Sequence, residues 1–596
     1  MNHQALAYPF DGKYIMRKRK SLRRELLAQE FLTEKKIAVL GGSTTHDILE
    51  IMELFLLNYG IKPLFYESEY AQYWQDVMFG NEKLAAFQPD VMLIHTTNRN
   101  ISAFPELTDS ADSIEKLLEQ QYGHFEAMWE KIAQDFHCPV IQNNFEYPYF
   151  RLLGNQDACR VHGRTNFISR LNQKFYEYAQ GHADFYIHDI NYESADFGLQ
   201  EWSDPFYWHM YKYALSQKAI PVFAFQAANI VKSIFGKNKK VLALDLDNTL
   251  WGGVVGDDGA EGLELGQETP PGQAYLEFQF YLKELKKQGV LLTVLSKNEK
   301  ENAMAGLKHP QMVLGPDDFV QIKADWEPKS ANLIQMADEL SLLPESFVFA
   351  DDNPAECEIV RQQVPGAAAV LLDRPEHSVL AIDRAGYFEM TAFSADDLKR
   401  SEMYRENVKR AERRNSFTDY RDYLLSLGMK ACIRPFEPVY LARIAQLTNK
   451  SNQFNLTTKR YTREQIGQVS ESGDYLTLYG RLEDCFGDNG VVSVVIGHLD
   501  GGSCHIELWL MSCRVLKRGM EDAMLDALVK ECGRRNVKNI YGYYYPTAKN
   551  SMVKEFYGTQ GFQKISGDAA SRDGTVWVLD LESPYTERNR CIRVED

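Results

Sequence analysis

The first third of the chain alternates short apolar runs with longer segments of helical periodicity. The apolar runs occupy residues 36–40, 91–94, 140–141 and 185–187, and a polar cluster follows each of them. Strands that alternate with helices predict a parallel sheet covered by helices. We therefore expect an α/β domain over residues 35–236, preceded by an N-terminal arm at residues 1–34.

A second series of the same kind follows the charged, glycine-containing segment 236–240. Its apolar runs, at 241–244, 290–295 and 347–350, show no polar alternation, which suits strands buried on both faces. We expect a second α/β domain over residues 237–393. Beyond it, helical patterns mix with strand-like runs, and this predicts a separate α+β domain over residues 394–596.

The composition of the chain argues against several classes of function. The chain has 596 residues and a formal net charge of −17, which argues against broad binding to nucleic acid or anionic membranes. The basic run at 16–24 is read as a solvated helix or arm. We find neither a membrane-spanning apolar stretch nor a signal-peptide core, and the nine cysteines lack CxxC spacing. Together these features predict a cytoplasmic protein without disulfides or a zinc site.

Polar residues follow all three strands of the second domain. Asp245 and Asp247 come after the first, Ser296 ends the second, and Asp351 and Asp352 follow the third. In an open parallel sheet these strand ends converge on one crevice, where ligands bind. Carboxylate-rich ligation suits Mg²⁺ better than zinc. The sequence therefore predicts a magnesium site at this edge.

These clusters resemble the four motifs of the haloacid dehalogenase (HAD) superfamily. Asp245-Leu-Asp-Asn-Thr249 matches its DxDxT motif, Ser296 its hydroxyl motif, Lys329 its lysine, and Asp351-Asp352 its acidic motif. The longer strings at 244–259, 296–298 and 351–354 resemble the FkbH-like family, HAD subfamily IIIC. The resemblance implies a Rossmann-like fold for this domain.

The resemblance also implies a role for each residue. Asp245 would attack phosphorus and form an aspartyl-phosphate, while Asp247 would act as general acid and then general base. The implied metal ligands are Asp245, Asp247, Asp351 and Asp352. The implied phosphate ligands are Thr249, Ser296, Lys297, Asn298 and Lys329, with Lys323 as an alternative to Lys329.

FkbH-like proteins take a glyceryl group from 1,3-bisphosphoglycerate and place it as a thioester on an acyl carrier protein in polyketide-like or related biosynthesis. Several members carry an acyl-accepting cysteine just before the hydroxyl motif, where this chain has Leu295. Leucine forms no thioester, so either the carrier thiol accepts the acyl group directly or the substrate differs. Cys357 is the nearest thiol in sequence, and we expect it in the core.

The N-terminal domain resembles the SGNH hydrolases, which have a flavodoxin-like fold. Ser43 stands at the nucleophile position, Asn98 at the asparagine block, and Asp204 and His209 at the last block, two residues further apart than usual. A working triad needs its members in hydrogen-bond reach. We favour the alternative that Gly42–Thr45 is a helix N-cap region and that the domain recognises a partner.

The C-terminal region resembles the acetyltransferase-like (GNAT) domain appended to FkbH-like proteins, on the strings 449–460, 512–519 and 546–550. The resemblance implies a site for coenzyme A or for the phosphopantetheine arm of a carrier protein. Its candidate residues are Arg514, Arg518, Gly519 and Asn550. The segment Arg514–Gly519 departs from the usual pyrophosphate motif.

Three hypotheses follow. The first is an enzyme that dephosphorylates an acyl donor and loads the acyl group onto an acyl carrier protein. The second is a magnesium-dependent phosphatase acting on a phosphorylated small molecule, which Leu295 favours. The third is a non-catalytic protein that docks carrier proteins, and the intact DxDxT motif disfavours it.

Overall fold

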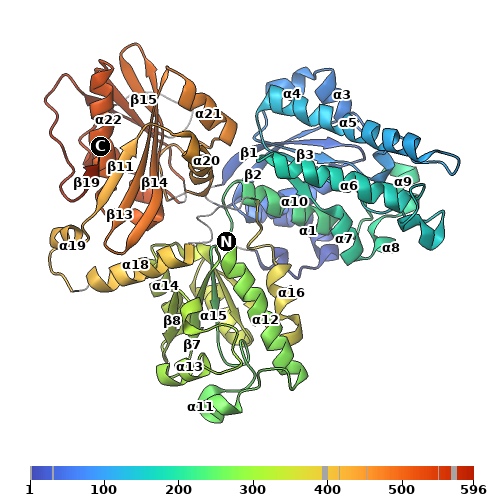
Figure 1. The fold of residues 1–596 in the computed structure, drawn as a ribbon, viewed down its shortest axis with the longest axis horizontal. Helices are drawn as coiled ribbons and strands as arrows, with labels where there is room; N and C mark the ends of the chain where they lie inside the picture. Colours follow the sequence, from blue (N-terminus) through green and yellow to red (C-terminus); the bar gives the residue numbers. More distant parts are fainter. Residues whose placement is uncertain are drawn as a thin grey trace. The chain divides into compact units, whose positions relative to one another are not determined.

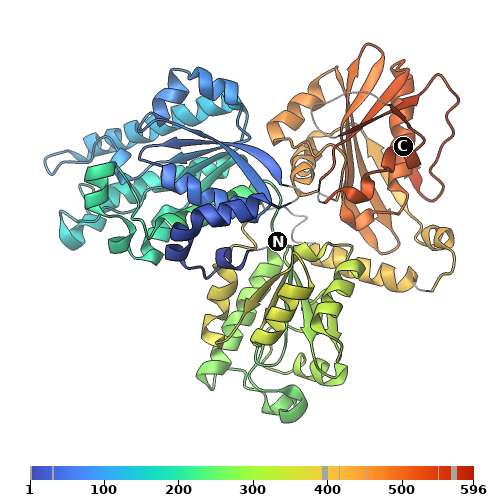
Figure 2. The same ribbon diagram turned by 180° about the vertical axis from the view of Figure 1, so that it is seen from behind.

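The computed structural model describes residues 3–29, 32–391, 400–414, 416–451, 453–547, 549–565 and 574–595. These residues form three sheets (Figures 1 and 2). They fall into two compact units. One contains the residues up to Phe235 together with 389–391, and the other contains Gly236–Phe388 together with the described residues from Arg400 onward. None of the described helices combines the length and apolarity needed to cross a bilayer.

The first sheet is parallel, in the order β2-β1-β3-β4-β5. Its strands are β1 (Thr33–Gly41), β2 (Ile61–Glu67), β3 (Val91–His95), β4 (Val140–Asn143) and β5 (Phe185–His188). Side chains that alternate along β1 face opposite layers. Ile37 and Val39 pack toward one group of helices, and Ala38 and Leu40 toward the other.

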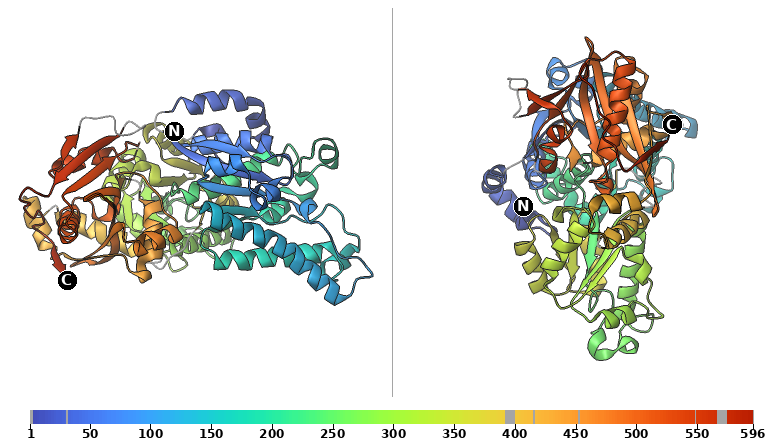
Figure 3. Two further views of the ribbon diagram at one scale, coloured as in Figure 1. Left: turned by 90° about the horizontal axis from the view of Figure 1, so that it is seen from above. Right: turned by 90° about the vertical axis from the view of Figure 1, so that its left-hand side faces the viewer.

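Helices cover both faces of this sheet (Figure 3, left). On one face lie α1 (Gly12–Leu27), α2 (His46–Asn58) and α10 (Ile220–Ile234). On the other lie α3 (Tyr73–Met78), α4 (Glu82–Phe87), α5 (Ala111–Phe136) and α6 (Arg164–Gly181). The remaining helices are α7 (Ile190–Phe197), α8 (Leu199–Trp202) and α9 (Pro205–Tyr211). The predicted arm contains α1, whose Leu22 and Leu26 are buried in the core.

The second sheet is also parallel, in the order β10-β9-β6-β7-β8. Its strands are β6 (Val241–Leu244), β7 (Leu291–Ser296), β8 (Gln321–Ala324), β9 (Phe347–Asp351) and β10 (Ala368–Leu371). One face packs against α12 (Pro270–Lys287), α13 (Lys300–Gly306) and α16 (Ser378–Asp383), and the other against α14 (Lys329–Glu339) and α15 (Pro354–Gln363). A short helix, α11 (Val255–Asp258), follows the β6 loop. The α/β prediction is confirmed for both parallel sheets.

The third sheet is mixed, in the order β17-β18-β16-β15-β14-β13-β11-β19, with β12 paired to β15. Its strands are β11 (Lys430–Arg434), β12 (Phe454–Asn455), β13 (Tyr475–Asp484), β14 (Gly487–Asp500), β15 (Ser503–Met511), β16 (Asn539–Tyr544), β17 (Gln563–Ile565), β18 (Thr575–Asp580) and β19 (Arg593–Glu595). The helices are α18 (Arg400–Arg414), α19 (Tyr420–Ser426), α20 (Leu441–Lys450), α21 (Arg463–Glu471), α22 (Met520–Arg534) and α23 (Phe556–Thr559). One face of the sheet packs on α20 and α21 and the other on α22.

The division into three domains stays a prediction, and its boundary at 393–394 lies outside the described residues. The structure does show how α18 is attached to the third sheet. Asp484, at the end of β13, is buried and accepts hydrogen bonds from Nη2 and Nε of Arg410 on α18, at 2.7 and 2.9 Å. Nη1 of Arg518 lies 3.2 Å from the same carboxylate. One buried carboxylate therefore holds α18 and the loop before α22 on the sheet.

We expect Asp484→Asn to lower the free energy of unfolding by about 3–5 kcal/mol, because it leaves the buried Arg518 without a counter-charge and Arg410 with only Glu406, 3.4 Å away. Thermal and urea denaturation followed by circular dichroism measure the change. Glu582→Gln, which breaks the exposed Lys538–Glu582 pair, is the control and should leave the transition unchanged. Equal stability of the Asp484 and Glu582 variants would contradict the expectation.

Candidate active site

Four side chains meet at the carboxyl edge of the second sheet. Asp245 follows β6, Ser296 ends β7, Lys329 begins α14 after β8, and Asp351 ends β9. All four are buried, and Asp351 is completely so. The strand order places β6 between β9 and β7, so their ends are neighbours, as expected where ligands bind in an open α/β sheet.

Lys329 links two of the carboxylates. Its Nζ lies 2.6 Å from Oδ2 of Asp351 and 3.0 Å from Oδ1 of Asp245. Burial lowers the pKa of Lys329, but the charges of Asp245 and Asp351 outweigh this and raise it. Burial and the charge of Asp245 raise the pKa of Asp351, although Lys329 opposes them. One ammonium group therefore does not neutralise the site.

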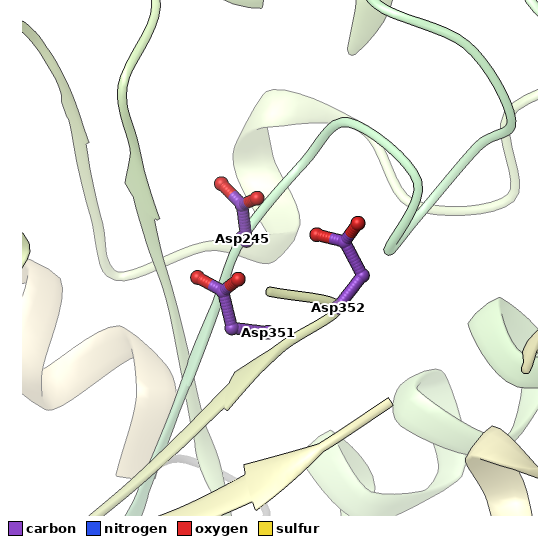
Figure 4. Close-up of side chains that lie close together, drawn as sticks. All are labelled: Asp245, Asp351 and Asp352. Atoms are coloured by element: carbon purple, nitrogen blue, oxygen red, sulfur yellow. The ribbon is translucent and has the colours of Figure 1, made fainter. Parts of the chain in front are cut away.

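Three carboxylates lie close enough to share one cation. Oxygens of Asp245, Asp351 and Asp352 lie within 4.8 Å of one another, and Figure 4 shows the three groups gathered at the strand ends. Burial and then the charge of Asp245 raise the pKa of Asp352 as well. Against the single Lys329, three carboxylates leave a formal excess of two negative charges (3 − 1). Hard oxygen donors and this excess fit Mg²⁺.

Asp247 is held beside this group by three donors. Its Oδ1 accepts from Nε1 of Trp251 at 2.9 Å and from the backbone N–H of Val255 at 3.0 Å. Its Oδ2 accepts from Nδ2 of Asn298 at 2.9 Å. Burial raises the pKa of Asp247 despite the donors from Val255 and Trp251. A fixed carboxyl group with a raised pKa suits a general acid.

The tight loop after β6 makes these contacts. Asn248 has φ of 53°, in the left-handed region, and its side chain accepts from the N–H of Gly253 at 3.1 Å. This turn brings Trp251 back over Asp247, with which it forms an isolated bridge. The sequence did not single out Trp251 as a positioning residue. Its only signal was the spacing of four residues from Asp247.

The other predicted phosphate ligands are placed as follows. Thr249 is buried, and its Oγ1 has no hydrogen-bond partner among the described residues. Nζ of Lys297 lies 2.6 Å from Oε1 of Glu356 on α15. The side-chain amide of Asn298 is hydrogen-bonded to the carboxyl group of Asp247. Nζ of Lys323 lies 3.3 Å from Glu339, so of the two candidate lysines only Lys329 pairs with Asp245 and Asp351.

The group around Asp245, Lys329 and Asp351 is termed the phosphatase-like site. Neither position 295 nor position 357 offers it an exposed thiol. Leu295 is completely buried. Cys357, on α15, is also buried, and its Sγ lies 3.5 Å from the carbonyl oxygen of Val370. Burial raises the pKa of the Cys357 thiol to about 12. Cys357 is therefore a core residue, and each of the nine cysteines is a free thiol.

The N-terminal candidates lie around the ends of β1 and β3. Ser43 is buried, and its Oγ has no hydrogen-bond partner among the described residues. Nδ2 of Asn98 donates to Glu146 at 2.7 Å. Asp204 caps α9 by accepting from the N–H of Phe206 at 2.9 Å, and His209 is exposed on the same helix. The contacts that the structure gives Asp204 and Asn98 do not link them to Ser43 as a triad.

The C-terminal candidates use their side chains inside the fold. Arg518 pairs with Asp484, and Nε of Arg514 donates to Oγ of Ser512 at 3.2 Å. Asn550 is completely buried, and its Nδ2 donates to the carbonyl groups of Asn455 and Tyr545 at 2.9 Å each. Gly519, with φ of 84°, precedes α22 as its N-cap. These contacts hold loops together.

The edge of β15 that β16 leaves free is paired with another segment of the chain. β16 pairs with β15 only from Ser503 to Ile506. β14 pairs with the other edge of β15. Beyond Ile506, β12 therefore pairs with the same edge of β15 as β16 does, and the N–H of Leu456 donates to the carbonyl oxygen of Trp509 at 3.1 Å. The N–H of Tyr545 in turn donates to Leu456 at 2.9 Å. The segment 454–457, termed the filling segment, thus closes the gap between β15 and the end of β16.

The first turn of α22 contains two acidic residues, Glu521 and Asp522. A pyrophosphate would need the free N–H groups at a helix N-terminus. Burial raises the pKa of Glu521 to about 7, and its Oε2 has no hydrogen-bond partner among the described residues. The side chains of Arg514, Arg518 and Asn550 are engaged within the fold and so are not available to coenzyme A.

Comparison with known proteins agrees with the phosphatase-like site. Residues 36–232 match the family model of the FkbH N-terminal domain. The N-terminal part of BF1531 from Bacteroides fragilis, which contains a phosphatase domain and was solved with Mg, is 29% identical with a TM-score of 0.58. The similarity covers 63% of this chain and 99% of that one. Residues 36–232 are thus similar to the FkbH N-terminal domain. This confirms the family that the motifs at the strand ends indicated.

Other solved structures that match are less similar in sequence. The ribosomal-protein-S18-alanine N-acetyltransferase from Escherichia coli is 14% identical, with a TM-score of 0.21, over 27% of this chain and 99% of that one. The spermidine N-acetyltransferase from Vibrio cholerae is 12% identical, with a TM-score of 0.22, over 26% and 96% of the two chains. A search of curated protein sequences finds no significant match.

We expect Mg²⁺ to raise the melting temperature of the wild-type chain, because it offsets the repulsion among three carboxylates. Asp352→Asn should remove most of this increase. It should leave the metal-free melting temperature unchanged or higher, since one repelling charge is gone. Differential scanning fluorimetry with and without Mg²⁺ measures both effects. Glu358→Gln, exposed on α15, is the control, and an undiminished Mg²⁺ effect in Asp352→Asn would contradict the assignment.

We expect neither coenzyme A nor pantetheine to bind the C-terminal domain, because Arg514, Arg518 and Asn550 are engaged within the fold and the first turn of α22 carries two acidic residues. Isothermal titration calorimetry of the full chain should show no saturable heat with either compound. Saturable binding that persists in Asp245→Asn, and so does not arise at the phosphatase-like site, would contradict this.

Proposed function

We propose that this protein is a Mg²⁺-dependent HAD-type phosphoryl-transfer enzyme. It acts during the loading of a glyceryl or related acyl group, from a donor such as 1,3-bisphosphoglycerate, onto an acyl carrier protein. The observation that carries the phosphoryl-transfer part is the joint contact of Lys329 with Asp245 and Asp351, beside the fixed Asp247. The acyl-loading part is supported by the FkbH-like family.

The first phosphoryl step uses the carboxylate of Asp245. An oxygen of Asp245 forms a bond to phosphorus while the bond between phosphorus and the leaving oxygen breaks. Asp247 gives its proton to the leaving oxygen, for which its raised pKa suits it. Lys329 and Ser296 hold the phosphoryl oxygens. Bound Mg²⁺, on Asp245, Asp351 and Asp352, would screen the nucleophile from the anionic substrate.

The second step returns the enzyme to its starting state. Asp247, now ionised, accepts a proton from water as the water oxygen attacks phosphorus of the aspartyl-phosphate. The bond from phosphorus to Asp245 breaks, and inorganic phosphate leaves. Trp251 and Asn298 keep Asp247 in one orientation through both proton transfers, since each donates to a different oxygen of its carboxyl group.

Acyl loading needs a different bond change. A carrier thiolate attacks the acyl carbon of the acyl phosphate, a thioester forms, and phosphate leaves with the electron pair. The phosphate ester at the other end of the same donor is then the substrate for Asp245. Direct attack by the carrier thiol is the route proposed here, because Leu295 and Cys357 are buried and supply no accessible thiol.

The second candidate is a phosphatase that acts on a small metabolite without acyl transfer. The buried Leu295, at the position where several family members have an acyl-accepting cysteine, favours this alternative. It predicts turnover of a phosphorylated metabolite at full rate with no carrier protein present. A metabolite panel assayed for phosphate release separates the two functions.

We expect Asp245→Asn to lower phosphate-ester hydrolysis by about 10³-fold or more, because the amide is not a competent nucleophile. The assay contains Mg²⁺, 1,3-bisphosphoglycerate and a phosphopantetheinylated carrier protein, and intact-protein mass spectrometry follows the carrier. Wild type should give a glyceryl-carrier mass. Asp257→Asn, exposed on α11, should behave as wild type. A carrier mass that never changes, alongside hydrolysis of a metabolite, would leave only the second candidate.

A further inference from the structure

The N-terminal domain has its own topological switch point. From β1 the chain continues to β2 on one side, and β3 lies on the other side, so the order is β2-β1-β3. Ligands of open α/β sheets bind outside the carboxyl ends of the strands at such a point. The residues that lie there are Gly41–Thr45 after β1 and Thr96–Asn100 after β3.

Ser43 lies between two loops at this point. On one side, Nδ2 of Asn100 donates to the carbonyl oxygen of Gly42 at 3.0 Å. On the other, the N–H of Thr44 donates to the carbonyl oxygen of Lys212 at 3.0 Å, and its Oγ1 donates to that of Tyr211 at 2.7 Å. Ser43 is 2% exposed with an unpartnered Oγ, and leaving a buried hydroxyl unsatisfied is costly. A ligand atom at this point would satisfy it.

Each of the two loops that contact the neighbours of Ser43 carries a cation, Arg99 beside Asn100 and Lys212 beside Tyr211. The guanidinium carbon of Arg99 lies 4.6 Å from the ring centre of Trp208, and Nζ of Lys212 lies 5.6 Å from it. Arg99 also lies 5.7 Å from the ring of Tyr149. Neither cation has an ion-pair partner among the described residues, although the chain as a whole carries a net charge of −17. Aromatic rings therefore fix both charges without neutralising them.

The carboxylates around the two loops are engaged elsewhere. Glu146 accepts from the N–H and Nδ2 of Asn98, at 3.3 and 2.7 Å. Burial raises the pKa of Glu146 to about 7, although Asn98 and Arg99 act in the opposite direction. Glu67 accepts from Oγ1 of Thr45 at 2.7 Å. The positive charge at Arg99 and Lys212 thus stays available to a ligand.

We propose that the ends of β1 and β3 form a second ligand site, which binds the carboxylate or phosphate group of a small anionic ligand. Arg99 and Lys212 supply the charge, and Oγ of Ser43 donates a hydrogen bond. The site binds and does not hydrolyse, because Asp204 is used as a helix cap and His209 is exposed on α9. It is independent of the phosphatase-like site and does not rest on the proposed function.

The test is isothermal titration of the full chain with inorganic phosphate and, separately, with glycerate, which distinguishes the two anions. The background is Asp245→Asn with a chelator present, so that phosphate handling at the second sheet is suppressed. One of the two anions should bind saturably. Arg99→Gln should weaken that binding about tenfold or more, since a charge-assisted hydrogen bond is lost.

Lys212→Gln and Ser43→Ala should each weaken binding by a smaller factor, and they keep the test valid if Arg99→Gln unfolds. Arg24→Gln, exposed on α1 of the same domain, is the matched control and should bind as the parent does. The proposal is overturned if neither anion binds the parent, or if the folded Arg99, Lys212 and Ser43 variants all bind as well as the control.

Discussion

The contact of Lys329 with Asp245 and Asp351 is the interaction on which the catalytic site depends. It brings residues from three separate strand ends to one point, and it does so in a buried environment where unpaired charges are expensive. The same contact leaves the carboxylates under-neutralised, so the site is built to receive a cation and then an anion. Stability of the apo site and affinity for the metal are therefore opposed at these positions.

The fold around this contact was predictable where the strands lie in the centre of a sheet. β6, β7 and β9 are mainly apolar runs, and the sequence places their limits to within one residue. The structure adds β2, β8 and β10, which lie at or next to sheet edges. β8 is only half-buried along its length and contains Lys323, and β2 contains Lys62 and Pro63. β2 and β8 therefore lack the hydrophobic pattern of a central strand, whereas β10 is a short apolar run.

Within the site, too, the sequence predicts the positions that regular strands fix and not those that loops fix. Asp245 and Asp351 could be placed because strand ends fix backbone positions, and that is a property of topology. The hydrogen-bond partners of Asp247 could not be predicted. They depend on how a short loop turns at Asn248, which has φ of 53°, and on the return of Trp251 to Asp247. Lys297 illustrates the opposite case. It stands next to Ser296 in sequence, yet its ammonium group pairs with Glu356.

The filling segment beside β15 bears on how a partner protein would transfer a group to this chain. The edge of β15 beside this segment is not open to another extended chain. In the proposed acyl loading, the position of the acyl group would then depend on the length of the carrier's own arm and on where the carrier docks. Encounter geometry, rather than storage of an intermediate, would set the pace of transfer.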